Sequence, residues 1–157
     1  MLRSFLAVGC GCFVGGILRY LLTLLLPGAA DGRFPWSTFA ANVLGCLLIG
    51  LLSGWLSRIA APDALRLFLT VGLCGGFTTF STFVADGRSL WQQQLTLTAV
   101  AYLCSSLVVG FALLWLGHRL TAGSSTDAHP PSAISPRFHS VVHQLAHRAP
   151  LHSHALP

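Results

Sequence analysis

The sequence predicts an all-α membrane protein with four transmembrane helices, the third of which is broken near the middle of the membrane. Three observations support this fold class. Hydrophobic residues make up 54% of the 157 positions, whereas charged residues make up only 8%. The apolar residues form four runs, each long enough to span a bilayer as a helix. The third run contains glycines and hydroxyl residues that interrupt its helical pattern.

Each predicted span covers about 30 Å at 1.5 Å per residue, which matches the hydrocarbon core of a bilayer. Helix-breaking residues mark the connections. Pro27-Gly28 follows the first run, Pro62-Asp63 precedes the third, and Asp86-Gly87-Arg88-Ser89 is expected to close the third. The predicted spans are Ser4–Leu26, Trp36–Leu56, Ala64–Ala85 and Leu95–Gly117.

The net charge of +5 comes from arginine, because all nine basic residues other than histidine are Arg. A protein that binds nucleic acid needs a clustered basic patch, but these arginines stand singly at the ends of apolar runs. We therefore expect a lipid bilayer and no nucleic acid as partner. The arginines are only weakly biased to one side of the membrane, so insertion in either orientation is compatible with the sequence.

Glycines recur four residues apart within three of the spans, and such small residues let helix backbones approach closely. The spacing fits two interpretations equally well, namely the association of two copies or the packing of helices within one chain. The pairs are Gly11/Gly15, Gly50/Gly54 and Gly72/Gly76.

The third span contains the segment Gly75-Gly76-Phe77-Thr78-Thr79-Phe80-Ser81-Thr82-Phe83. In hydrocarbon every backbone polar group needs an internal partner, so a broken helix is tolerated only inside protein or beside an aqueous path. The positive edge of an aromatic ring can meet an anion, and conduction requires binding weak enough for release. We therefore predict an ion pathway in which Phe80 and Phe83, one turn apart, offer successive anion stations.

Polar residues within the other spans are further candidates. An arginine inside a membrane is costly and usually functional, so Arg19 either lies near an anion entrance or extends to the nearer interface. The amide of Asn42 could donate to an anion or bond a neighbouring helix. A hydroxyl stripe in the fourth span could line a pore or bond its own helix; it comprises Thr98, Tyr102, Ser105 and Ser106.

Taken together, Gly15-Gly16-Ile17-Leu18-Arg19-Tyr20, Asn42 and Gly75–Phe83 resemble the Fluc-type (CrcB) family of fluoride channels. The resemblance extends over about residues 4–118. It implies a dual-topology homodimer of antiparallel subunits in the bacterial inner membrane. Two parallel pores in such a dimer would carry fluoride passively out of the cytoplasm and lower the intracellular fluoride concentration.

The resemblance also implies roles for individual residues. Each pore would take Phe80 from one subunit and Phe83 from the other, with Asn42 as the pore-lining amide and Arg19 near the aqueous vestibule. A central structural sodium ion would be bound by backbone carbonyls of both subunits at Gly75 and Thr78. The positions that match the polar track of the pore are Ser81, Thr82, Tyr102 and Ser106.

Residues 121–157 are predicted to form a flexible tail rich in His and Pro, separate from a channel domain of residues 1–120. His139, His143 and His147 recur every four residues. A helix would align them on one face, where they could bind a metal. A loosely ordered tail fits the composition as well, and the resemblance does not extend to this region.

Two other function classes compete with a channel. A small proton-coupled drug exporter would need an acid within a span, and only Asp86, at the predicted edge of the third, comes close. A non-conducting assembly subunit would account for the glycine pairs but leaves the Phe/Thr segment unexplained. An enzyme is not expected, because the membrane part of the sequence contains no catalytic dyad or metal-binding set.

Overall fold

The computed structural model describes residues 1–29, 33–59 and 61–122, and all regular elements in these ranges are helical. Four segments are long and apolar enough to cross a membrane, which confirms the predicted number of spans. The segments are Leu2–Leu25, Trp36–Arg58, Asp63–Gln92 and Thr96–Ala122. Most of the predicted tail lies outside the described residues, including His139, His143 and His147; Thr121 and Ala122 are the last two residues of the final helix.

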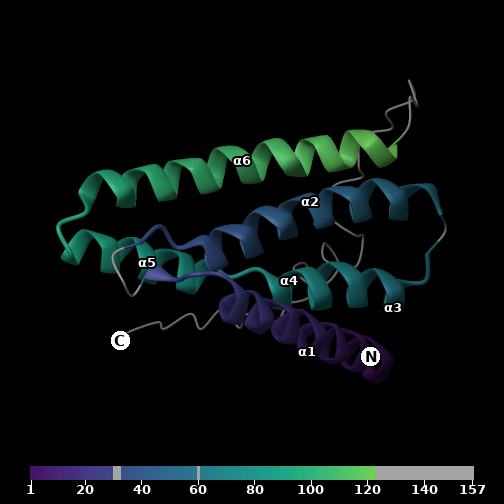
Figure 1. Ribbon diagram of the computed structural model, residues 1–157. Coiled ribbons are helices and arrows are strands. Elements are labelled where there is room, and N and C mark those ends of the chain that lie inside the picture. The colour runs from purple at the N-terminus through teal and green to yellow at the C-terminus, as the bar shows by residue number, and fades with distance from the viewer. Residues whose placement is uncertain (30–32, 60, 123–157) are drawn as a thin grey trace, which may run out of the picture. The chain divides into compact units, whose positions relative to one another are not determined.

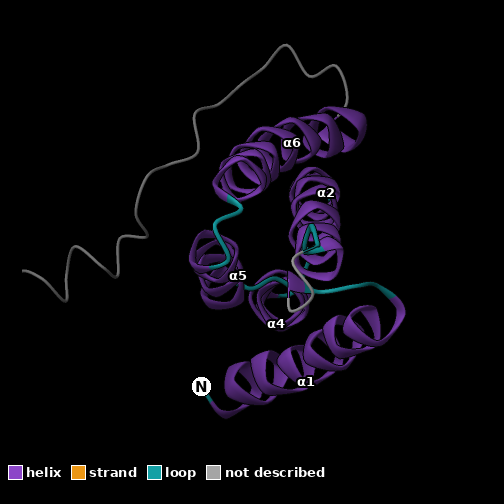
Figure 2. Ribbon diagram, turned by 60° about the vertical axis from the view of Figure 1, so that its left-hand side comes forward, coloured by secondary structure: helices purple, strands orange, loops and turns teal. Residues whose placement is uncertain are grey.

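Three of the spans are single α-helices (Figure 1). The first is α1 (Leu2–Leu25), the second α2 (Trp36–Arg58) and the fourth α6 (Thr96–Ala122). α2 and α6 pack extensively against each other and lie side by side in both ribbon views (Figures 1 and 2).

The third span is broken near its middle, as predicted. Thr78 and Thr79 have extended backbones, with φ/ψ of −82°/159° and −149°/120°. A helical ladder cannot continue through two extended residues, so the chain ends one helix and starts another. In order, the pieces are α3 (Asp63–Arg66), the π-helical η2 (Leu67–Cys74), α4 (Gly75–Phe77) and α5 (Phe80–Gln92).

The prediction that Asp86-Gly87-Arg88-Ser89 closes the third span is wrong, because all four residues are helical within α5. Gly87 is buried instead against α6, where an added Cβ would lie 3.1 Å from Leu103 Cδ2. The chain turns later, at Gln94, whose φ of 62° is left-handed. The glycine therefore permits close packing and does not mark a helix end.

The glycine pairs pack helices within one chain, which decides between the two interpretations left open by the sequence. Gly11 of α1 faces Gly72 of η2, and a Cβ on either glycine would lie 2.8 Å from the Cα of the other. On α2, a Cβ at Gly50 would meet the backbone of Leu114. These contacts hold α1 against the third span and α2 against α6.

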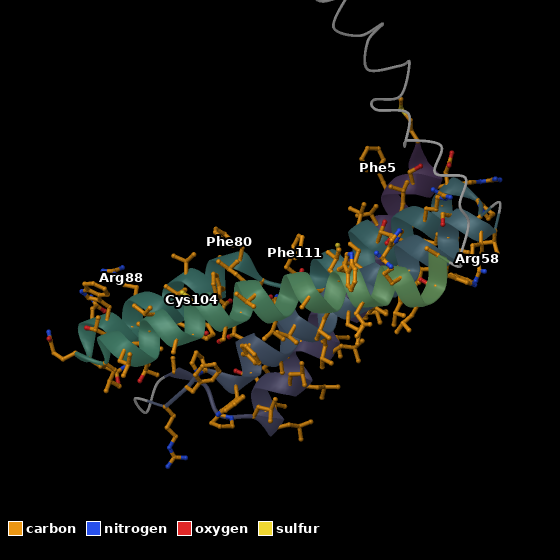
Figure 3. The ribbon with its side chains drawn as sticks, turned by 90° about the horizontal axis from the view of Figure 1, so that it is seen from above. Phe5, Arg58, Phe80, Arg88, Cys104 and Phe111 are labelled. Carbon is orange, nitrogen blue, oxygen red and sulfur yellow. The ribbon has the colours of Figure 1, made fainter. Side chains whose placement is uncertain are left out.

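One side of the bundle is apolar and has no described helix packed on it. Phe80 of α5 and Phe111 of α6 are 76% and 75% exposed, and both project from this side (Figure 3). The neighbouring part of α5 is packed: Phe83, Leu90 and Tyr102 are buried together between α5 and α6. The two phenylalanines of the predicted pathway lie one turn apart on α5 with ring centroids 6.0 Å apart, but Phe80 is exposed whereas Phe83 is buried.

Candidate functional site

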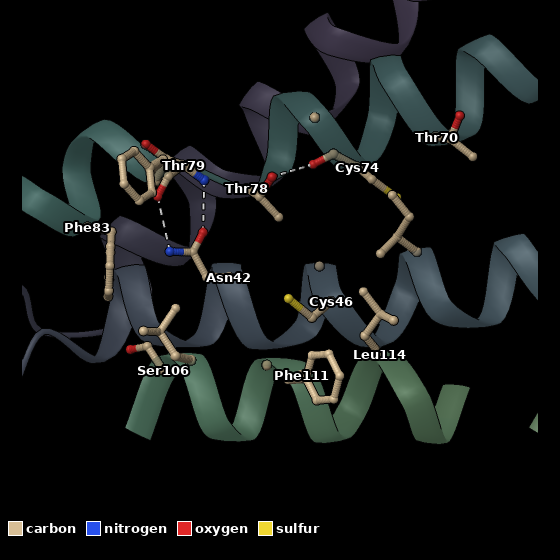
Figure 4. A pocket seen from close by; sticks show the side chains of 16 residues that line it. Asn42, Cys46, Thr70, Cys74, Thr78, Thr79, Phe83, Ser106, Phe111 and Leu114 are labelled. Carbon is tan, nitrogen blue, oxygen red and sulfur yellow. Dashed lines mark hydrogen bonds between the residues drawn. The ribbon is translucent and has the colours of Figure 1, made fainter. Parts of the chain in front are cut away.

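The break in the third span is joined to α2 by a two-point hydrogen bond. Asn42 Nδ2–H donates to the Thr79 carbonyl at 3.0 Å, and the Thr79 N–H donates to Asn42 Oδ1 at 2.8 Å (Figure 4). The Thr79 N–H is therefore diverted from the helical acceptor four residues earlier, the Gly75 carbonyl. The side-chain amide of Asn42 thus supplies the hydrogen-bond partners that the helix no longer provides at Thr79. A hydrogen bond to a neighbouring helix is one of the two roles predicted for Asn42.

Thr79 is also the N-cap of α5. Its Oγ1 accepts the Thr82 N–H at 3.2 Å and donates its proton to Thr82 Oγ1 at 3.0 Å. Because Thr82 Oγ1 acts as the acceptor in this pair, its own hydroxyl proton is left for another partner. The N-terminus of a helix carries a partial positive charge, so the start of α5 favours an anion.

A cavity of about 490 Å³ opens between α2, α6 and the third span (Figure 4). Its polar residues include Asn42, Thr79 and Ser106, and none of its described lining residues is charged. Most of the remaining wall is apolar. The lining consists of Asn42, Gly45, Cys46, Ile49, Thr70, Cys74, Gly75, Thr78, Thr79, Phe80, Phe83, Ser106, Leu107, Gly110, Phe111 and Leu114.

A second pocket of about 150 Å³ lies on the other side of Thr79 and contains the intramembrane arginine. Arg19 of α1 lines it together with hydroxyl residues of α2 and α5. Thr79 belongs to the walls of both cavities, so the capped break separates a charged pocket from an uncharged one. The lining consists of Gly16, Arg19, Tyr20, Thr23, Ser37, Thr38, Thr79 and Thr82.

The predicted pathway residues fall into three groups: some line the larger cavity, some line the smaller pocket, and some line neither. Phe80, Phe83 and Ser106 line the larger cavity together with Asn42, and the ring centroids of the two phenylalanines are 6.0 Å apart. Thr82 lines the smaller pocket with Arg19.

The other two residues of the predicted polar track line neither cavity. Ser81 is exposed, and Tyr102 is fully buried behind Phe83. The Ser106 hydroxyl donates to the Tyr102 carbonyl at 2.7 Å, so its proton is bonded back to its own helix.

The carbonyls implied for a sodium ion flank the break: Gly75 is the first residue of the three-residue α4, and Thr78 directly follows that helix. The Gly75 carbonyl has lost its helical donor, because the Thr79 N–H bonds Asn42. No described residue donates a hydrogen bond to the Thr78 carbonyl. Carbonyl oxygens without donors are suitable ligands for a hard cation, so the residues present fit the ion that the resemblance implies.

Thr79 is the important site residue that sequence reasoning missed. It lies in an uninterrupted run of phenylalanine, threonine and serine residues, Phe77–Phe83, and its role depends on where the helix restarts. The sequence did contain a partial signal, because Thr is a favoured N-cap and Thr79 directly precedes the residue at which α5 begins. Its pairing with Asn42 joins positions 37 residues apart and has no local pattern.

Comparison with known proteins agrees with this architecture. A family model described as "CrcB-like protein, Camphor Resistance (CrcB)" matches residues 6–118. The chain is 43% identical over 116 residues to the fluoride-specific ion channel FluC of Phocaeicola vulgatus, which covers 74% of this chain and 96% of that protein. It is 44% identical to the protein of the same name from Methylobacillus flagellatus, covering 72% and 90% of the two chains. A third such channel, from Novosphingobium aromaticivorans, is 42% identical over 76% of this chain and 95% of its own length.

The family model covers nearly all of the described helices, and these relatives are named as ion channels. The chain is therefore a multi-pass membrane protein and not an enzyme. It belongs to the CrcB family.

Proposed function

We propose that this protein is a fluoride-selective channel. The observation that carries the proposal is the helix break capped by Asn42 and Thr79, which lies between the arginine pocket and the uncharged cavity. Relatives that are 41–44% identical and named fluoride-specific ion channels support the same assignment. Fluoride is small and strongly hydrated, so a pore must replace its water with closely spaced donors.

Donors are available along the route from one cavity to the other. Arg19 draws anions into the smaller pocket, where the free hydroxyl proton of Thr82 can be donated to them. Beyond Thr79, the second N–H of Asn42 is not donated to any described residue. The edges of Phe80 and Phe83 add partial positive charge without a fixed cation. An uncharged cavity allows a small anion to leave again.

The working unit is a homodimer of antiparallel subunits with two pores. Phe80 is 76% exposed and projects from the apolar side together with Phe111 and Leu107, so one protomer leaves part of its cavity wall open. A second copy on this side would complete the wall, with Phe80 of one copy and Phe83 of the other at each pore. A structural sodium ion between the copies would be held by the carbonyls of Gly75 and Thr78.

The protein lies in the bacterial inner membrane and releases fluoride passively. Hydrogen fluoride crosses membranes uncharged and dissociates in the less acidic cytoplasm. A membrane potential that is negative inside favours the outward movement of an anion by about 2.3 kcal/mol per 100 mV. No coupled ion is needed for export down this gradient.

The direct test is anion efflux from liposomes that contain the purified protein. We expect rapid fluoride efflux when a potassium ionophore balances the charge, and at most slow chloride efflux under the same conditions. Liposomes without protein provide the baseline. Equal efflux of the two anions would contradict selectivity, and fluoride efflux at the baseline rate would contradict the proposed channel.

A further inference from the structure

Asp86 is an acid within the third candidate membrane-spanning segment, Asp63–Gln92, in its last third. It lies six positions beyond the start of α5 and is only partly buried. A carboxylate in this position is costly unless it is paired. Thr38 of α2 supplies a partner, because its Oγ1–H donates to Asp86 Oδ2 at 2.6 Å.

Tyr102 of α6 completes a polar corner between three helices. Its side chain is fully buried, and its hydroxyl has no hydrogen-bond partner among the described residues. Its ring lies 5.2 Å from that of Phe83, measured between centroids, and Phe83 precedes Asp86 by one turn of α5. A buried hydroxyl without a partner is unfavourable by about 1–3 kcal/mol, so a small adjustment that joins it to the carboxylate is strongly favoured.

The Thr38–Asp86 bond and the Asn42–Thr79 pair fix the same two helices at neighbouring turns. Thr38 and Asn42 are four residues apart and therefore lie on one face of α2. Asp86 lies seven residues after Thr79, so these two residues likewise lie on one face of α5 and its N-cap. Phe83 lies between the two links. Its ring is 5.2 Å from the ring of Tyr102 on one side and 6.0 Å from that of Phe80 on the other, measured between centroids.

We propose that Asp86 is a positioning residue for the permeation pathway, whose carboxylate holds Thr38 and Tyr102 together and thereby fixes the ring of Phe83 at the cavity wall. The inference rests on the proposed channel function. It also gives Asp86 a role that differs from that of a proton carrier, which is the role that a proton-coupled exporter would require of this acid. A positioning acceptor needs a hydrogen-bonding oxygen at this place, whereas a proton carrier needs a group that ionises.

Two substitutions separate these roles. Asp86→Asn keeps an oxygen that can accept from Thr38, so we expect fluoride efflux to stay within about twofold of the wild type. Asp86→Leu removes the acceptor of the Thr38 hydroxyl, so efflux should fall about tenfold, as the loss of one charge-assisted hydrogen bond allows. Thr38→Val should have a similar effect, and the double variant Thr38→Val/Asp86→Leu should be no worse than either single one.

A matched control removes an equivalent bond elsewhere. Thr121 Oγ1 donates to the Leu51 carbonyl at 2.9 Å and joins α2 to α6 far from Phe83. Thr121→Val should lower thermal stability to a similar extent while leaving the efflux rate of folded protein unchanged.

A spectroscopic readout tests the positioning without relying on transport. With 4-fluorophenylalanine at position 83 of the purified protein, we expect the fluorine chemical shift to be the same in wild type and Asp86→Asn. It should move in Asp86→Leu and in Thr38→Val. If Asp86→Leu fails to fold, Thr38→Val still decides the question.

Three results would overturn the proposal. Loss of efflux in Asp86→Asn equal to that in Asp86→Leu would show that the charge or its proton matters. Normal efflux and an unmoved fluorine signal in Thr38→Val would show that the link positions nothing. Full additivity of the two single changes would show that they act separately. Absence of fluoride efflux in the wild type would instead contradict the channel function, while the fluorine signal would still report on the position of Phe83.

Discussion

Asn42 and Thr79 form a closed pair in which one side-chain amide satisfies both the N–H and the C=O of one backbone residue. In hydrocarbon, where water cannot serve as partner, such a pair allows a helix to be interrupted. The family resemblance implies that a second subunit and a sodium ion lie at this break. Both backbone groups of Thr79 are instead bonded by Asn42 of the same chain. The carbonyls of Gly75 and Thr78, which precede Thr79, are left for a cation.

Removing the amide of Asn42 should destabilise the protein. Asn42→Ala leaves both groups of Thr79 unpaired, at about 1–3 kcal/mol for each group. Asn42→Asp still accepts the N–H but places an oxygen against the Thr79 carbonyl, so it should be intermediate. Thermal unfolding in detergent measures both. Gln93→Ala, which removes a long 3.4 Å contact to the Ala29 carbonyl and an exposed 3.1 Å hydrogen bond to Ser89 Oγ, is the control; an Asn42→Ala variant as stable as this control would contradict the assigned role.

The hydroxyl of Thr79 should matter separately from its backbone. Thr79→Ser keeps the N-cap and the donor to Thr82, so its stability and fluoride efflux should approach those of the wild type. Thr79→Val loses both bonds, and N-cap loss typically destabilises by about 1 kcal/mol. Fluoride efflux through Thr79→Val should also fall, because the Thr82 hydroxyl loses the hydrogen bond from Thr79 that fixes the direction in which it donates its own proton. Equal efflux in the two variants would show that the hydroxyl has no part in conduction.

The glycine contacts predict opposite effects for two neighbouring substitutions in α1. Gly11→Ala places a Cβ 2.8 Å from Gly72 Cα and should destabilise by about 1–3 kcal/mol. Gly9→Ala meets nothing within 4 Å and should be neutral or stabilising, since alanine favours helices by up to about 1 kcal/mol over glycine. Thermal unfolding compares them. Identical melting of both variants would argue against this packing.

Substitutions of Phe80 and Phe83 should differ in their effect on the stability of the protein but not in their effect on fluoride conduction. Within one protomer Phe83 is 8% exposed and Phe80 76% exposed, so Phe83→Ile should destabilise the fold of the protomer itself, whereas Phe80→Ile affects only the proposed contact with the second copy. Either change should sharply reduce fluoride efflux while the dimer persists in light scattering. Phe13→Ile, on the exposed surface of α1 and outside both cavities, is the control. Normal efflux in both pathway variants would refute the role of the ring edges.

Sodium should stabilise the assembled protein. An ion that binds only the folded state stabilises it by about 2.7 kcal/mol at about 100 times its dissociation constant. Protein purified in N-methylglucamine chloride should therefore melt earlier than protein in sodium chloride, and added sodium should restore the difference. The same melting curve in both salts would remove sodium from the proposal.

The sequence was sufficient for the four spans and for the break, because both depend on local properties. Length and hydropathy define a span, and Gly75–Phe83 contains its own helix-breaking pattern. The end of the third span was misplaced because Asp86 and Gly87 are usual helix terminators in isolation. Their partners, Thr38 and Leu103, are far away in the chain and become visible only in the packed structure.

The candidate site was predicted in part for the same reason. Asn42 and Ser106 were found as polar residues within apolar spans, and Phe80 and Phe83 by their spacing in the broken segment; all four line one cavity. Tyr102 was expected beside Ser106 from helical spacing, yet its ring is turned into the core between Phe34 and Phe83. Periodicity gives the face of a helix, whereas the direction of a large ring depends on what it packs against.

The pairing of Asn42 with Thr79 also bears on how the protein is made. Ribosomes synthesise α2 before the third span. Asn42, whose amide bonds the interrupted backbone, is therefore already in the bilayer when Thr79 leaves the translocon. A nascent chain can thus place its most polar backbone directly against a waiting partner, before any other subunit arrives.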